Sequence, residues 1–131
     1  MSHEISIEFQ GEYIHARHTG ADSYDISLEL WQRIMAACRE HDCFNILGES
    51  DNTNELSTLE AFAHIAIYRK VGMSARHRIA WVNHNPRHHR IFDFIETVLK
   101  NRFVVNGHIF ESVAEAERWL LSRVDTPTPL R

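Results

Sequence analysis

Residues 78–121 read RIAWVNHNPRHHRIFDFIETVLKNRFVVNGHIFESVAEAERWLL, and this stretch decides the fold. The apolar run Arg78–Asn83 predicts a buried strand, and Pro86 stands near the first turn of a helix, where a missing N–H costs nothing. A short strand around Phe103–Phe110 follows, and Ser112 begins a capping box for a last helix. This alternation of strands and helices is typical of a largely parallel sheet.

The earlier half of the chain adds a hairpin and two further helices. A link as short as the one around Gly11 forces antiparallel pairing of the first two strands. The patterns predict strands at Ile5–Phe9, Tyr13–His18 and Cys43–Leu47, a helix capped by Asp22 or Ser23, a polar segment Gly48–Asn54, and a helix capped by Ser57. The prediction is an α/β domain of order ββαβαβαβα, with a mixed, mostly parallel five-stranded sheet and packed helices. It occupies residues 1–124, and the proline-containing residues 125–131 are expected to form a flexible tail.

Composition narrows the classes of function. The chain has 131 residues, a formal net charge of −4, and fourteen Lys and Arg that are scattered along it. Because tight nucleic-acid binding needs a concentrated basic face, we expect no nucleic-acid partner. No apolar run approaches the ~20 residues of a transmembrane helix. Cys38 and Cys43 match no metal or redox spacing, so we expect reduced, buried thiols in a cytoplasmic protein.

The element order, the strand RIAWV, the piece IFES and the closing AERWL together resemble the SpoIIAA-like branch of the STAS superfamily. Ala116, Trp119 and Leu120 have the spacing typical of the last helix in that branch. The resemblance implies a bacterial-type regulator with a small mixed sheet, and it implies a domain that acts by binding protein. The branch is also similar to CRAL-TRIO domains, which implies a small apolar ligand or lipid as the alternative.

Antagonists of anti-sigma factors in this superfamily carry a phosphorylated Ser or Thr at the start of the helix after the third strand. The matching segment here is ESDNTNELSTLEA, which departs from the Asp-Ser-Ser/Thr-Gly pattern. The resemblance therefore places a candidate phosphorylation site at Ser57 or Thr58. Spacing alone supplies another interpretation, because Ser57 and Glu60 form a capping box that stabilises the helix without any modification.

The helix that starts at Ser57 is apolar over more of its circumference than one sheet contact needs. Leu59, Phe62, Ala63 and Ala66 make one face, and Ile65, Ile67 and Tyr68 lie off it. The second set predicts an exposed patch for a protein partner, which includes a second copy of the chain in a homodimer. One alternative is that a neighbouring helix or the next loop covers these residues. Another is a ligand pocket between this helix and the next. The candidate surface residues are Phe62, Ile65, Ile67, Tyr68 and Phe94.

Ten histidines prompt a search for catalytic or metal sites. His84 and His88 stand four residues apart with Asp93 beyond, which would suit a metal-assisted hydrolase. However, Pro86 makes His84 non-helical, and a solvated helix start explains the cluster equally. The chain has no GxSxG elbow, GxGxxG fingerprint or phosphate-binding loop. We therefore expect no catalytic residues, no cofactor and no metal.

Overall fold

The computed structural model describes residues 2–54, 57–102 and 106–122 of the chain, without the side chains of residues 58 and 99–102. The expected flexible tail, residues 125–131, lies outside the described residues. The elements are β1 (His3–Phe9), β2 (Ile14–Gly20), α1 (Tyr24–His41), β3 (Asn45–Asn52), α2 (Thr58–Lys70), β4 (Arg78–Asn83), a 3-10 turn (Pro86–His88), α3 (His89–Arg102), β5 (Asn106–Phe110) and α4 (Val113–Leu120). Their sequence confirms the predicted order ββαβαβαβα.

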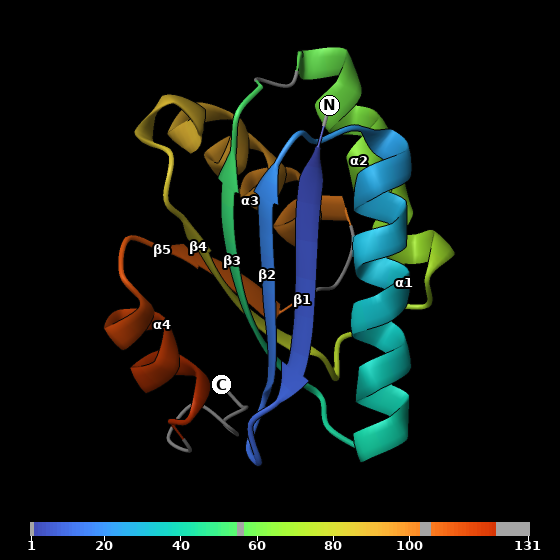
Figure 1. Cartoon of the computed structure of the whole chain (residues 1–131), viewed down its shortest axis with the longest axis vertical. Coiled ribbons are helices and arrows are strands. Elements are labelled where there is room, and N and C mark those ends of the chain that lie inside the picture. Colours follow the sequence, from blue (N-terminus) through green and yellow to red (C-terminus); the bar gives the residue numbers. More distant parts are fainter. Residues whose placement is uncertain (1, 55–56, 103–105, 123–131) are drawn as a thin grey trace.

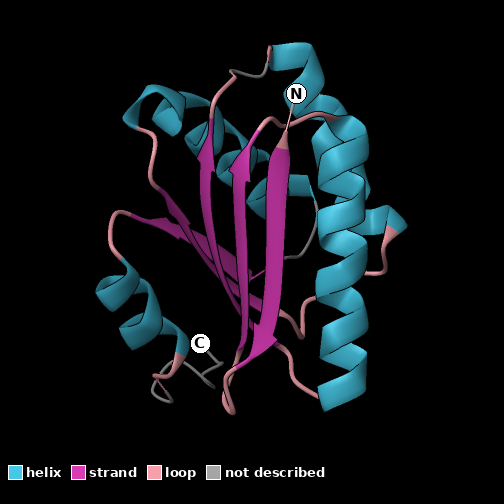
Figure 2. Cartoon of the chain, viewed as in Figure 1, coloured by secondary structure: helices cyan, strands magenta, loops and turns pink. Residues whose placement is uncertain are grey.

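The five strands form one sheet in the order β1-β2-β3-β4-β5 (Figures 1 and 2). β1 pairs with β2 in antiparallel orientation, and the other neighbours are parallel. Each parallel step is bridged by a helix, as a crossover requires. The mixed, mostly parallel sheet is therefore confirmed.

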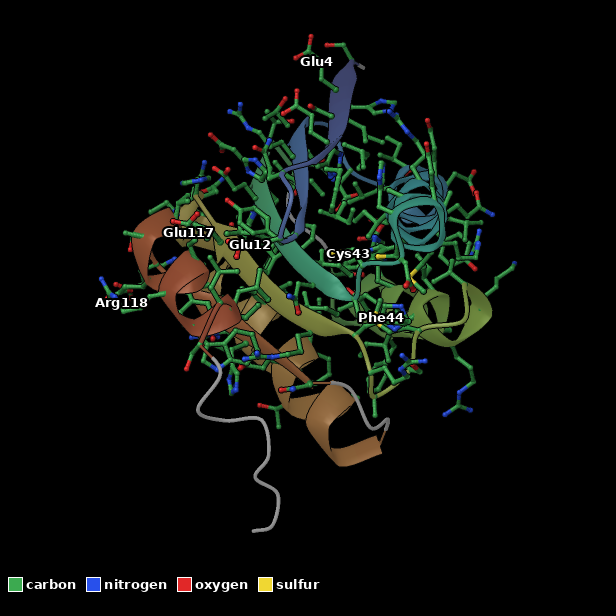
Figure 3. All side chains as sticks on the ribbon, turned by 90° about the horizontal axis from the view of Figure 1, so that it is seen from below. Glu4, Glu12, Cys43, Phe44, Glu117 and Arg118 are labelled. Atoms are coloured by element: carbon green, nitrogen blue, oxygen red, sulfur yellow. The ribbon has the colours of Figure 1, made fainter. Side chains whose placement is uncertain are left out.

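The helices divide unequally between the two faces of the sheet. α1, α2 and α3 cover one face, and their apolar side chains form the larger core with Ile14, Ile46 and Trp81. α4 covers the opposite face, where Ala116 and Leu120 pack against a smaller core. Figure 3 shows α4, with Glu117 and Arg118, across the sheet from α1. This asymmetry places the larger core on the side of the three helices.

The side chain of Trp81 on β4 approaches the backbone of Gly48 on the neighbouring strand β3. These residues are register partners. A Cβ at position 48 would lie 2.0 Å from Cζ3 of the Trp81 ring, so only glycine fits without displacing the indole. The Trp81 ring therefore packs against the β3 backbone at Gly48, and its Nε1 donates a hydrogen bond of 3.0 Å to the Ser50 hydroxyl.

β3 is longer than the sequence predicted. The expected strand ended at Leu47, but β3 continues to Asn52 through residues assigned to a polar loop. Parallel pairing on both sides supports this extension, because Asn52 opposes Gly20 in β2 and Ser50 opposes Asn83 in β4. Ser50 and Asn52 are buried, so polar side chains at the carboxyl end of β3 enter the interior. The predicted start of the last strand, Phe103, lies outside the described residues.

Candidate functional site

A cavity of about 100 Å³ lies between the sheet and helices α1, α2 and α3. Its walls combine aromatic rings, aliphatic side chains and several polar groups, and they are formed by residues of seven helices and strands together with Asp22 before α1. The lining residues are His18, Asp22, Ser27, Leu30, Trp31, Ser50, Asn52, His64, Ile67, Tyr68, Ile79, Trp81, Phe92, Ile95, Glu96, Gly107, His108 and Ile109. The polar ends of β2 and β3 and the start of α1 therefore meet the apolar faces of three helices in one space.

An aspartate and a histidine from distant parts of the chain face each other in this cavity. Asp22 precedes α1, and its Oδ1 accepts hydrogen bonds from the Ser27 hydroxyl at 2.7 Å and from the Ser23 N–H at 2.8 Å. Its Oδ2 lies 3.8 Å from Nε2 of His64 on α2. The other ring nitrogen of His64, Nδ1, lies 2.8 Å from the carbonyl oxygen of Glu60, to which it donates. The carboxylate is thus fixed by α1 and the imidazole by α2.

Burial and charge act in opposition on this pair. Burial by itself would raise the pKa of Asp22, but the facing His64 and the Ser27 hydroxyl lower it below its ordinary value. Burial would lower the pKa of His64, but the Asp22 carboxylate and the Glu60 carbonyl raise it above its ordinary value. An imidazolium facing a carboxylate is therefore favoured over a neutral pair.

The pKa of a second histidine in the cavity, His18, is shifted in the opposite direction from that of His64. Nε2 of His18, on β2, lies 3.2 Å from the carbonyl oxygen of Ala21. Its Nδ1 lies 3.4 Å from Nδ2 of Asn52. Since the amide donates and the carbonyl accepts, these partners assign the neutral Nε2–H tautomer. Burial lowers the pKa of His18 below its ordinary value. His15, three residues earlier, lies on the opposite face of the sheet, as strand alternation predicts.

The five candidate surface residues divide between the interior and the exterior. Ile67 and Tyr68 line the cavity, and Ile67 is fully buried. The prediction that Ile67 belongs to an exposed patch is therefore wrong. Ile65 is half-buried. Phe62 is 43% exposed and its ring packs edge-on at 5.3 Å against that of half-buried Phe94 on α3.

The exposed apolar surface of α2 is instead the other face of the helix. Leu59 is 80% exposed, and Phe62, Ala63 and Ala66 are also exposed. These four residues, here called the α2 stripe, follow the i, i+3, i+4, i+7 spacing of one helix face. The two faces are inverted relative to the prediction because His64 takes an inward position with Ala61 and Ile67.

Ser57 is the N-cap of α2. Its hydroxyl accepts from the Glu60 N–H at 3.1 Å, and its own N–H donates to Oε1 of Glu60 at 2.8 Å, which confirms the predicted capping box. The side chain of Ser57 is exposed. Phosphorylation at Ser57 stays a prediction, and so does phosphorylation at Thr58, whose side chain is outside the described set.

The histidines near the start of α3 are separated. Nε2 of His84 lies 2.8 Å from Oε1 of Glu49, and Oε2 of Glu49 lies 2.5 Å from Nε2 of His15. By contrast, His88 is buried and Asp93 is exposed. Within the residues that the structure describes, no group of three or more His, Cys, Asp and Glu side chains is placed to hold a metal ion. Both cysteines are buried free thiols, as predicted, and burial raises the pKa of Cys38 to about 11.

The polar groups of the cavity were missed by sequence reasoning, although one signal was present. His64 has helical spacing with Ala61, Ile67 and Tyr68, which marks it as part of an inward face. Asp22 was identified only as a candidate cap. The pairing of Asp22 with His64 depends on how α1 and α2 pack, which no local pattern specifies.

Comparison with solved structures identifies the fold. The chain is similar to an uncharacterised protein of the DUF3478 family with a SpoIIAA-like fold from Shewanella loihica PV-4, with 18% sequence identity and a TM-score of 0.56. The alignment covers 90% of this chain and 93% of that one. No family model and no curated protein matches the sequence. The expected SpoIIAA-like fold is therefore confirmed. No helix in the described part of the chain has the length and apolar character that a membrane crossing requires.

Proposed function

We propose that this chain is a non-enzymatic, STAS-like protein-interaction domain that binds its partner through the α2 stripe. The observation that carries the proposal is the outward exposure of Leu59 and Phe62 on one helix face. Full burial of a Leu or Phe side chain contributes about 1.5–3 kcal/mol, so two such residues can supply the centre of an interface. The Phe62–Phe94 ring contact extends the apolar surface onto α3.

The first partner to test is a second copy of the chain, because the α2 stripe is complementary to itself. In an antiparallel pairing of two α2 helices about a twofold axis, Leu59 of one copy would face Ala66 of the other. Phe62 would face Ala63 in the same way. Large side chains then oppose small ones along the helix contact, which is a self-complementary arrangement of the kind that a twofold dimer requires.

The modification that the STAS resemblance implies would act on the same surface. A phosphate on Ser57 or Thr58 would add negative charge within two residues of Leu59, next to the Glu60 carboxylate. Such a group would oppose burial of the stripe in an apolar interface. A partner that binds through the stripe would therefore be released by phosphorylation.

Sedimentation velocity over a range of concentrations tests the self-pairing. We expect the wild type to show a monomer–dimer equilibrium, and Leu59→Glu to weaken it at least about tenfold, equivalent to about 1.4 kcal/mol. Leu59 is 80% exposed, so folding stability should change by no more than about 0.5 kcal/mol. Gln32→Glu, which adds the same charge on the exposed side of α1, is the matched control. A wild type that stays monomeric throughout would contradict the homodimer.

A further inference from the structure

The cavity contains a polar atom that the fold leaves unsatisfied. Nε2 of His64 is buried and has no hydrogen-bond partner among the described residues. Only 9% of the His64 side chain is exposed, and the nearest carboxylate oxygen, Oδ2 of Asp22, is 3.8 Å away, beyond hydrogen-bond distance. A buried donor or acceptor without a partner costs about 1–3 kcal/mol. The site is therefore more stable when a further group supplies the missing contact.

The two facing atoms set the chemistry of that group. Nδ1 of His64 is committed to the Glu60 carbonyl, and Oδ1 of Asp22 is committed to Ser27 and Ser23. Nε2 and Oδ2 are left facing the cavity. An imidazolium N–H donates and a carboxylate oxygen accepts, so a group that does both satisfies the two atoms together. A hydroxyl is such a group: its oxygen accepts from Nε2, and its hydrogen is donated to Oδ2.

The rest of the cavity sets the size and shape of the ligand. Trp31 lies with its ring centre 4.9 Å from that of Tyr68 and 5.3 Å from that of Trp81, and all three rings line the space. The cavity volume of about 100 Å³ is below the ~300–1,000 Å³ of sites for drug-sized ligands. An apolar cavity of ~150 Å³ holds benzene, so this smaller and partly open space accommodates at most one ring, and a long acyl chain does not fit. Glu96 and His108, which are partly exposed, lie at the side where α3 meets β5.

We propose that the cavity binds a small phenol-class ligand, with its ring against the aromatic walls and its hydroxyl between Asp22 and His64. Binding requires no covalent step and no cofactor. It uses atoms on the opposite side of α2 from the stripe, so it is independent of partner binding. Water is the alternative occupant, and it would satisfy Nε2 without using the aromatic walls.

Nuclear magnetic resonance with phenol and toluene as probes separates these outcomes. Toluene carries a methyl group in place of the hydroxyl and is otherwise matched in shape. The indole N–H signals of Trp31 and Trp81 report on the cavity. The backbone N–H signal of Gly11, in the turn between β1 and β2, is an internal control. We expect phenol to shift the first two signals saturably and to bind at least about tenfold more tightly than toluene, as a hydrogen bond to charged groups implies.

Variants test the role of the polar pair. Asp22→Asn and His64→Leu should each reduce the preference for phenol over toluene to less than about threefold, whereas Leu59→Glu should leave it unchanged. Equal affinity for both probes in the wild type would overturn the hydroxyl site, even if neither variant folds. Absence of any shift at Trp31 and Trp81, or an equal shift at Gly11, would show that phenol does not bind specifically in the cavity and would overturn the proposal.

Discussion

Asp22 connects three parts of the molecule through its carboxylate and its backbone N–H. One oxygen holds the start of α1 through Ser23 and Ser27, and the other faces His64 on α2. The backbone N–H of Asp22 also donates a hydrogen bond of 2.8 Å to the side-chain oxygen of Asn54. Because only 11% of the Asp22 side chain is exposed, its charge is compensated mainly by protein groups. The stability of this region should therefore depend on pH.

The pH dependence follows from the two pKa directions. The pKa of His64 is raised above 6.5, so its contribution is complete below about pH 6.5 and is lost as the pH rises through the higher folded value. The pKa of Asp22 is lowered below 3.8, so its contribution is present above about pH 3.8 and is lost as the pH falls through the lower folded value. The pair stabilises the fold most between these limits.

We expect Asp22→Asn to lower the free energy of unfolding by about 1–3 kcal/mol at about pH 5.5, and by less at about pH 9. Urea titration of both proteins at the two pH values measures the difference. The exposed carboxylate Asp25 provides the control, because Asp25→Asn should show no such pH dependence. A loss that is the same at both pH values would show that the charge of His64 does not contribute.

The ends of α2 could be predicted from the local sequence, whereas the face of α2 that packs inward could not. The capping box at Ser57 and the stop at Gly72, with a φ of +89°, depend on neighbouring residues and could be predicted. The inward face could not be chosen from hydrophobicity, because both faces of α2 carry large apolar side chains. Burial of His64 decides the choice, and it is stabilised by Asp22, which is far away in sequence.

The cap of α2 gives a direct test of that local prediction. We expect Ser57→Ala to cost about 1 kcal/mol of folding stability, since it leaves the Glu60 N–H without its acceptor. Thermal and urea unfolding measure the effect. Glu60→Gln keeps an oxygen that accepts from the Ser57 N–H, so its cost should be under about 0.5 kcal/mol. Equal losses in both variants would contradict this expectation and show that the charge of Glu60 contributes as much as the Ser57 cap.

The whole molecule was predictable in its order of elements and much less so in its sites. Strand periodicity, short links and helix caps specify ββαβαβαβα, and right-handed crossovers then leave few possible sheets. The extension of β3 to Asn52 depends on long-range pairing, and so does the cavity. Ser50 and Asn52 are polar and have the local pattern of loop residues, and it is pairing with β2 and β4 that makes this segment a strand. What results is a sheet with a partly open cavity on one side of α2 and an exposed apolar stripe on the other.

In-cell photo-crosslinking from position 59 tests the proposed interaction surface most directly. A benzophenone amino acid replaces Leu59 in one version of the protein and Gln32, on the exposed side of α1, in the other. We predict a covalent adduct with a defined protein, either a second copy or another chain, from position 59 alone. Adding Phe62→Glu should abolish it. The same products from both positions, or none from position 59, would contradict the assignment of the α2 stripe as the binding surface.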